Sequence, residues 1–207
     1  MEIEAETGIY LVKLARHAAE LWIKGEKTPQ PLEPIPEQAK FVTGAFVTVK
    51  SINGNEHNLR GCIGYPIGID PLYEEVINLA KASTLNDPRF PPVQEQELPN
   101  LVFEVTVMTP PQIIKYSSPE NLLEQVNVPG DGLIVKLGRF QGLLLPQVPI
   151  EQGWTAEEFL SYTCRKAYLP MDAWKEENIK VEKFQGIIFS EMEPNGTIVK
   201  QELENSC

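Results

Sequence analysis

The hexapeptide LRGCIG, Leu59 to Gly64, combines residue types that could activate a thiol. Side chains alternate along a β-strand, so Arg60 and Cys62 share one face of a strand that contains them both. A permanent cation beside a sulfur stabilises thiolate over thiol, which makes a cysteine nucleophilic. Gly61 and Gly64 would let a ligand or another backbone approach closely. The pattern fits a reactive cysteine, although free cysteines also serve as small apolar residues packed in a core.

A second group of polar residues lies in NDPRFPP, Asn86 to Pro92. Each proline restricts the preceding residue to extended conformations, so Asp87 is held in place and Arg89 projects from a stiffened loop. Rigid loops often orient binding groups, which would make Asp87 a proton carrier and Arg89 an anchor for an anion. The alternative is a connector in which Asp87 caps a turn and Arg89 forms a surface ion pair.

Two further polar residues are candidates because of the strands near them. In LVFEVTVM, Leu101 to Met108, one face is fully apolar and Glu104 lies on the other. Glu104 is either a solvent-facing residue or a cleft carboxylate that meets Arg60 or Arg89. Gln147 follows the apolar stretch GLLLP and could donate and accept hydrogen bonds at a strand end, or simply mark the exit into a loop.

The first half of the chain must position most of these residues. Helical spacing of apolar residues predicts a helix over residues 6–24, which Gly25 ends, and a proline-rich connector follows. Strands over 45–50 and 57–65, with a turn at Asn53-Gly54, predict a hairpin that carries LRGCIG on its returning arm. Asp70-Pro71 predicts an N-cap and first turn for a helix to residue 83, and 101–108 is the next strand.

The second half repeats the order strand, strand, helix, strand. Strands are expected over 133–137 and 142–145, Thr155 with Glu158 predicts a capping box for a helix to residue 167, and 181–190 is a closing strand. The pattern predicts an α+β fold: either two unequal lobes with a cleft between them, or an internally duplicated strand-strand-helix-strand unit. The sheet should be mostly antiparallel and flanked by helices, because hairpins dominate.

The composition of the chain argues against several classes of function. The 207 residues carry a net charge of −11 with a pI of about 4.7, which argues against a broad nucleic-acid or anionic membrane footprint. No apolar run is long enough to span a membrane. Three widely spaced cysteines, Cys62, Cys164 and Cys207, indicate free thiols in a reducing cytoplasm, and two histidines cannot build a histidine-rich metal site. We expect no cofactor and no metal.

LRGCIG, DPRFPPV (87–93), GLLLPQV (142–148) and GWTAEEFLSYTCRKA (153–167) together resemble the AMMECR domain family, in the order and approximate spacing of its signatures. The resemblance covers residues 5–191 and implies one domain over 1–207, with lobes over approximately 40–110 and 111–191 and the 6–24 helix packed on the body. It also implies that signature residues gather at one cleft. These residues are Arg60, Gly61, Cys62, Gly64, Asp87, Arg89 and Gln147.

Two functions fit these residues. The first is an enzyme in which Cys62 is the thiolate nucleophile or a covalent handle, and Arg60 is its electrostatic activator or a carboxylate anchor. Asp87 or Glu104 would be the proton carrier, and Arg89 would hold a small anionic substrate. Gly61, Gly64 and Gln147 would then help to bind that substrate. The second is an interaction or regulatory module in which LRGCIG serves only hairpin packing. The resemblance names Memo-like and radical-SAM proteins as candidate partners, because the microbial family members can occur alongside or fused to them.

Overall fold

The structure, a computed structural model, describes residues 2–26, 28–54 and 56–201. The chain forms two units, one made of Met1–Met108 with Ile187–Glu202 and the other built around Thr109–Gly186. Strand β7 (Lys180–Glu191) contributes residues to both, so the chain enters the second unit after β3 (Leu101–Met108) and returns along β7.

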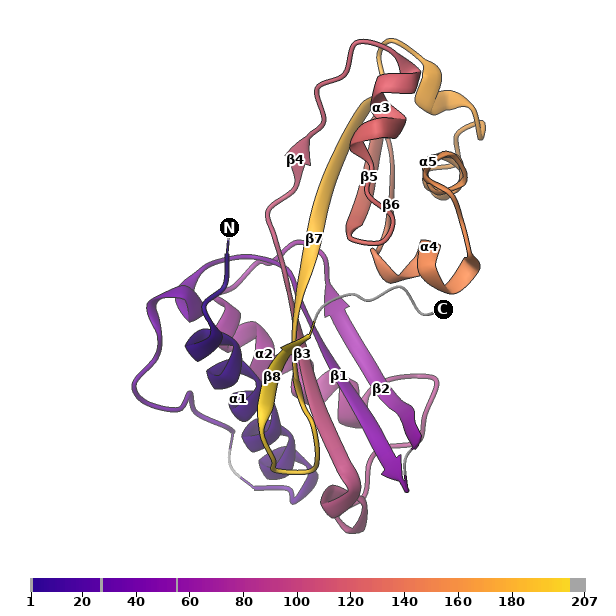
Figure 1. The fold of residues 1–207 in the computed structure, drawn as a ribbon. Helices are drawn as coiled ribbons and strands as arrows, with labels where there is room; N and C mark the ends of the chain where they lie inside the picture. Colours follow the sequence, from indigo (N-terminus) through magenta and orange to yellow (C-terminus); the bar gives the residue numbers. More distant parts are fainter. Residues whose placement is uncertain (1, 27, 55, 202–207) are drawn as a thin grey trace. The chain divides into compact units, whose positions relative to one another are not determined.

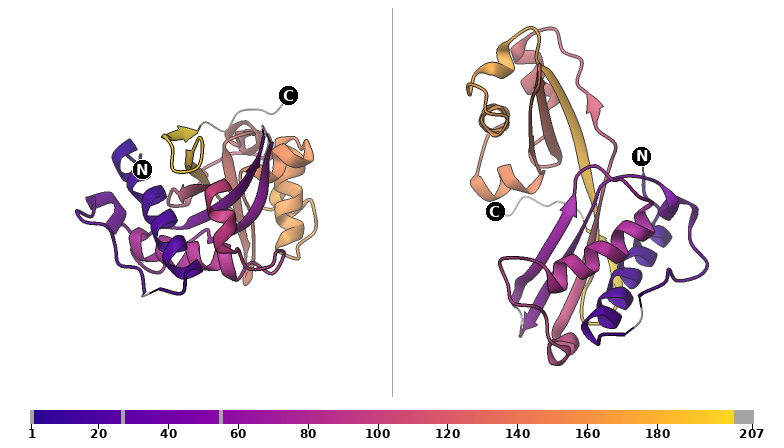
Figure 2. Two further views of the ribbon diagram at one scale, coloured as in Figure 1. Left: turned by 90° about the horizontal axis from the view of Figure 1, so that it is seen from below. Right: turned by 180° about the vertical axis from the view of Figure 1, so that it is seen from behind.

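The first unit is an antiparallel sheet with helices α1 (Ala5–Ile23) and α2 (Leu72–Leu85) on one face (Figures 1 and 2). Strand β1 (Ala45–Asn53) lies between β2 (Glu56–Tyr65) and β3, and the end of β7 continues the order and pairs with β8 (Ile198–Gln201). The apolar face of β3 predicted from its alternation lies in the core with both helices. β2 is the strand at the edge of this order.

Helix α2 begins differently from the prediction. Pro71, rather than Asp70, occupies the N-cap position, and no side chain caps this helix. The Glu75 carboxylate instead accepts hydrogen bonds from the backbone N–H groups of Ile69 and Asp70. Glu75 therefore satisfies N–H groups of the loop before α2, while the N–H of Leu72, the first residue of the helix, donates to the Phe41 carbonyl oxygen.

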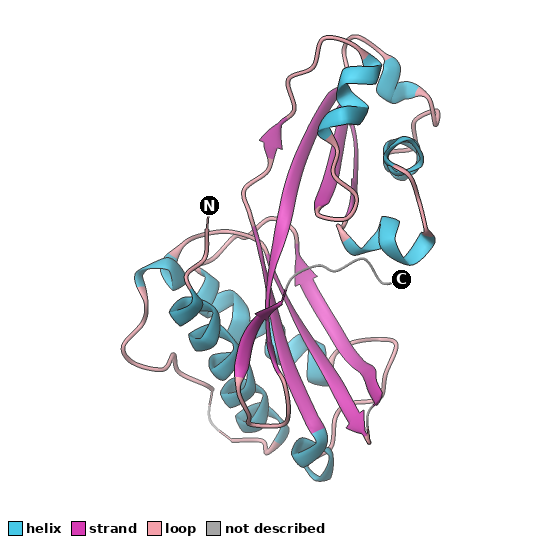
Figure 3. Cartoon of the chain, viewed as in Figure 1, coloured by secondary structure: helices cyan, strands magenta, loops and turns pink. Residues whose placement is uncertain are grey.

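The second unit packs helices on a smaller antiparallel sheet (Figure 3). Strand β5 (Asp131–Leu137) lies between β6 (Phe140–Leu144) and the first part of β7, which also pairs with β4 (Gln112–Ile113). Its helices are α3 (Pro119–Gln125), α4 (Gln147–Gln152) and α5 (Ala156–Lys166). Thr155 and Glu158 form the predicted capping box of α5, with both reciprocal hydrogen bonds present.

The predicted α+β class, with an antiparallel sheet flanked by helices, is confirmed. Helix α1 matches the predicted 6–24 helix within a residue at each end, and Gly25 follows it at a φ of 68°. In residues 2–26, 28–54 and 56–201, no helix combines the length and hydropathy of a membrane span. The predicted cleft between lobes stays a prediction.

Candidate functional site

LRGCIG lies on β2 as predicted, but a β-bulge interrupts the alternation of its side chains. Val49 pairs with Gly61 while the next residue of β1, Lys50, pairs with Leu59, so Arg60 is the extra residue on β2. A bulge leaves the extra residue unpaired and re-aims its side chain. The simple alternation of side chains that would place Arg60 beside Cys62 therefore does not hold at this point in the strand.

The Arg60 guanidinium binds Glu97 rather than contacting the thiol. Arg60 Nε donates to Glu97 Oε2 at 2.7 Å and Nη2 donates to Oε1 at 3.1 Å, a two-pronged ion pair. This pair lowers the pKa of Glu97. The structure therefore differs from the prediction that Arg60 activates Cys62, because the Arg60 guanidinium pairs with Glu97. The arginine whose charge reaches the sulfur is Arg89.

Cys62 is the first of three polar residues that lie opposite one another on adjacent strands. It is paired with Thr48 on β1, and Thr48 is paired with Glu104 on β3. The Thr48 hydroxyl donates to Cys62 Sγ at 3.3 Å. Glu104 is buried, and its carboxylate binds Lys50 Nζ at 2.8 Å. The partner of this buried carboxylate is therefore Lys50, rather than either of the arginines that the sequence suggested.

The environment of Cys62 favours the thiol over the thiolate. Burial raises the pKa of the Cys62 thiol above its usual range. The hydrogen bond from Thr48 and the positive charge of Arg89 lower this pKa by less, and the Glu104 and Asp87 carboxylates raise it again. At neutral pH the sulfur is therefore protonated, the opposite of the activation predicted from the arginine in LRGCIG.

The DPR sequence of residues 87–89 clasps the edge of β2 at Cys62. The Cys62 N–H donates to Asp87 Oδ2 at 2.9 Å, and Arg89 Nη2 donates to the Cys62 carbonyl oxygen at 3.0 Å. Asp87 also accepts hydrogen bonds from Arg89 N, Nε and Nη2. The loop thus occupies the hydrogen-bonding groups that an edge strand would otherwise offer to another strand.

Asp87 is unsuited to carrying protons. Its side chain is 2% exposed and that of Arg89 is 52% exposed, so the pair runs from the interior to the surface. The hydrogen bonds from the Arg89 side chain, followed by those from the Cys62 and Arg89 backbone N–H groups, hold the pKa of Asp87 far below its usual range. The carboxylate stays ionised at every physiological pH.

The two glycines serve close packing. A Cβ on Gly61 would overlap the carbonyl oxygen of Ser83 in α2, and one on Gly64 would overlap the carbonyl oxygen of Ala45 and the Phe46 ring. The predicted close approach is therefore made by neighbouring chain at both positions. No cluster of histidine, cysteine and acidic side chains suitable for a metal occurs within residues 2–26, 28–54 and 56–201.

Gln147 belongs to the second unit, whereas the other predicted site residues belong to the first. It is the first residue of α4, directly after Pro146, rather than the end of a strand. Sequence reasoning also missed the partners Thr48, Lys50 and Glu97. Their roles depend on strand register and on the packing of distant segments, so no local signal marked them.

Two adjacent segments of the first unit carry exposed apolar side chains. The backbone of residues 41–44 runs beside that of residues 65–72, with Val42 bridged to Pro71 and the Leu72 N–H donating to the Phe41 carbonyl oxygen at 2.9 Å. Gly44 and Gly68 allow the contact, because a Cβ on either would overlap the opposite backbone. We call the exposed residues of these segments the apolar patch: Phe41, Val42, Tyr65, Ile67 and Ile69.

A cysteine-bearing edge strand clasped by an Asp-Pro-Arg loop, on a sheet backed by two helices, defines the structural class of the chain. Residues 12–189 match the AMMECR1 family. Relatives include a protein of Thermofilum pendens, 44% identical over 98% of both chains, and PH0010 of Pyrococcus horikoshii, 47% identical over 98% of both chains. The chain belongs to the AMMECR1 family, as its signatures predict.

The fold is also that of a solved relative. The crystal structure of PH0010, an uncharacterized protein, superposes with a TM-score of 0.81 at 46% sequence identity, covering 98% of this chain and 100% of that one. MJ0810 of Methanocaldococcus jannaschii is 41% identical over 96% of both chains. These relatives span the same length as this chain and fix its fold and family.

Proposed function

We propose that this protein is a cytoplasmic protein-interaction module that docks a partner through the apolar patch. The observation that carries the proposal is the gathering of large apolar side chains on two adjoining segments, with Ile69 82% and Val42 59% exposed. Contiguous exposed apolar residues are typical of surfaces that bind another protein. The free thiols of Cys62 and Cys164 suit a reducing compartment.

The state of the LRGCIG site supports a scaffold role over catalysis. Its charged groups are committed to one another, as Asp87 with Arg89, Arg60 with Glu97, and Lys50 with Glu104. Its thiol has a raised pKa. An enzyme of the cysteine type would need a thiolate and a group able to exchange protons near neutral pH. The apolar patch adjoins this site, because Tyr65 is the last residue of β2.

The family association makes a Memo-like protein the first partner to test, with a radical-SAM protein as the second. Burying one large aliphatic side chain contributes about 1.5–3 kcal/mol, so Ile69→Asp should weaken association by about tenfold or more. The measurement is isothermal titration of each purified partner with the wild-type protein and the variant. Ile113→Asp is the matched control, because Ile113 is 60% exposed on β4, outside the patch.

Three results would overturn the proposal. The first is equal binding by wild type and Ile69→Asp, and the second is no binding of either partner by the wild-type protein. The third is a turnover that Cys62→Ser abolishes while the fold is retained, which would establish the enzyme instead. The expected result is that Cys62→Ser binds the partner as tightly as the wild-type protein does.

A further inference from the structure

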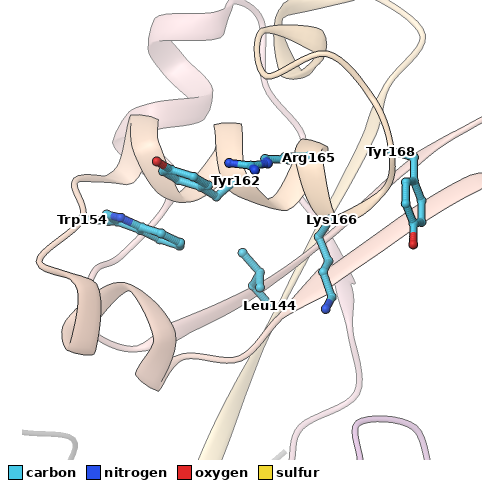
Figure 4. A pocket seen from close by; sticks show the side chains of 6 residues that line it. All are labelled: Leu144, Trp154, Tyr162, Arg165, Lys166 and Tyr168. Carbon is cyan, nitrogen blue, oxygen red and sulfur yellow. The ribbon is translucent and has the colours of Figure 1, made fainter.

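A pocket of the second unit, independent of the apolar patch, gathers aromatic and cationic side chains at the end of α5. It encloses about 350 Å³ and is lined by Leu144, Trp154, Tyr162, Arg165, Lys166 and Tyr168 (Figure 4). In Figure 4 the Trp154 and Tyr162 rings lie at one end and Tyr168 at the other, with Leu144 and Lys166 between them. Ligand pockets of this size accept small molecules.

One end of the pocket is an aromatic platform. The rings of Trp154 and Tyr162 are stacked with centroids 4.0 Å apart and an angle of 4° between their planes. Trp154 and Leu144 also pack against the core of this unit, which fixes the platform in place. The stacked pair forms an aromatic wall at this end of the lining, against which the ring of a ligand can pack edge-to-face or offset.

The pocket also holds two cations. Arg165 and Lys166 stand in the last turn of α5, where positive charge offsets the helix dipole, and that role alone would explain them. However, no carboxylate whose side chain the structure describes forms an ion pair with either residue. In a protein of net charge −11, two such cations beside an aromatic wall favour an anion at this place.

Tyr168 occupies a backbone position that tyrosine rarely adopts. Its φ is 60°, and its side chain is 91% exposed. The Tyr168 N–H donates to the Arg165 carbonyl oxygen and the Leu169 N–H donates to that of Cys164, the two bonds of a Schellman motif that ends α5. Glycine is the usual residue at this position, because a side chain there is strained. Neither the helix end nor the core explains a tyrosine here, whereas a ligand contact does.

We propose that this pocket binds a small aromatic anion. The planar ring of the ligand packs on the aromatic side chains, and its carboxylate or phosphate group is held by Arg165 and Lys166. Both anions would be recognised by the same charge-assisted hydrogen bonds. A long polyanion such as nucleic acid is disfavoured, because the pocket is small and the strongly acidic protein repels extended negative charge.

The test compares charged probes with their neutral analogues. Isothermal titration of the full chain with 2-naphthoate against 2-naphthamide, and with adenosine monophosphate against adenosine, separates ring from charge and carboxylate from phosphate. A ligand of this size in a half-open pocket should bind with a Kd of about 1 mM or tighter. Each neutral analogue should bind about tenfold more weakly or not at all. Equal binding of charged and neutral probes, or binding of neither anion, would overturn the proposal.

Variants then place the ligand in the pocket. The double change Arg165→Gln with Lys166→Gln should lower the affinity for the anion about tenfold, whereas Arg139→Gln, a cation of the same unit outside this lining, should leave it unchanged. Tyr168→Gly should also weaken binding yet raise the Tm by a few degrees, because glycine relieves the strain at positive φ. A lower Tm for Tyr168→Gly would show that Tyr168 is structural and would contradict its role here.

Discussion

Replacement of Asp87 by asparagine tests how the DPR loop clasps β2. Each oxygen of the Asp87 carboxylate accepts two hydrogen bonds: Oδ1 from Arg89 N and Nε, and Oδ2 from Cys62 N and Arg89 Nη2. An asparagine amide has one oxygen and one NH₂ group. Whichever way the amide is turned, its NH₂ group faces two donors. Asp87→Asn therefore loses two hydrogen bonds and the charge, although its shape is nearly unchanged.

The size of the effect follows from burial. Hydrogen bonds to charged groups contribute about 1.5–3 kcal/mol each, and a buried donor without a partner adds a penalty. The Arg89 side chain is 52% exposed, so its guanidinium can turn into water and recover part of the loss. We therefore expect Asp87→Asn to lower the free energy of unfolding by about 2–4 kcal/mol at pH 7. Asp70→Asn, the same change at an exposed position, should alter it by less than about 0.5 kcal/mol.

The pH dependence of this difference has a defined sign. The pKa of Asp87 is depressed in the folded protein, so its contribution is complete above the unfolded value of about 3.9. It is lost as the pH falls from there toward the folded value. The stability difference between wild type and Asp87→Asn should therefore be constant from pH 7 to about pH 5 and shrink below about pH 4.

Urea unfolding followed by circular dichroism measures the total effect, and amide hydrogen exchange at Cys62 measures the local one. Because the Cys62 N–H donates to Asp87, its exchange should accelerate in Asp87→Asn more than that of central residues of β1. The reasoning is refuted if the loss of stability at pH 7 is below about 1 kcal/mol. It is also refuted if the difference between the two proteins stays constant down to pH 3.

Three further predictions concern single residues. Because burial raises the pKa of its thiol, Cys62 should react with iodoacetamide more slowly than a free thiol at pH 7.5, and the midpoint of its pH profile should lie above that of a free thiol. Peptide-resolved mass spectrometry measures the rate, and a rate faster than that of a free thiol would contradict the scaffold role. Gly61→Ala should lower the free energy of unfolding by about 1–3 kcal/mol or more, because the new Cβ overlaps the Ser83 carbonyl oxygen. The control is Leu59→Ala on the same strand, which should lower it by less than about 1 kcal/mol; urea unfolding measures both variants. Thr155→Ala should remove the cap of α5 and lower the free energy of unfolding by about 1 kcal/mol, which thermal unfolding would detect as a lower Tm. An unchanged Tm would mean that the capping box does not stabilise the protein.

Local signals predicted the elements whose cause is local. The helix of residues 6–24 follows from apolar spacing and a glycine stop, and the α5 capping box is a four-residue pattern. The strand predicted over residues 101–108 has the observed bounds, because every second residue from Leu101 to Val107 is apolar and packs in one core with α1 and α2. In each case the physical cause and the sequence signal lie in the same few residues.

Features set by distant segments escaped the same reasoning. Arg60 was placed beside Cys62 by simple alternation, but the register shift opposite Val49 and Lys50 turned it toward Glu97. Pro146 after an apolar run predicts that the chain leaves a strand at Gln147, yet proline is equally suited to begin a short helix, and Gln147 is the first residue of α4.

The LRGCIG and DPR sequences contain residue types that suggest chemistry, and the structure joins these residues by hydrogen bonds to one another and to the backbone of β2. Arginine, aspartate and cysteine at these positions are the types that a thiol enzyme requires, and they do converge on one place, the backbone of Cys62. The proposed scaffold role rests on how the hydrogen-bonding capacity of these residues is used. Both carboxylate oxygens of Asp87 accept hydrogen bonds from donors of the protein itself, two at each oxygen. These bonds occupy the lone pairs that could otherwise accept a proton from a substrate. The same bonds hold the guanidinium of Arg89 at the edge of β2, the strand whose last residue, Tyr65, belongs to the apolar patch.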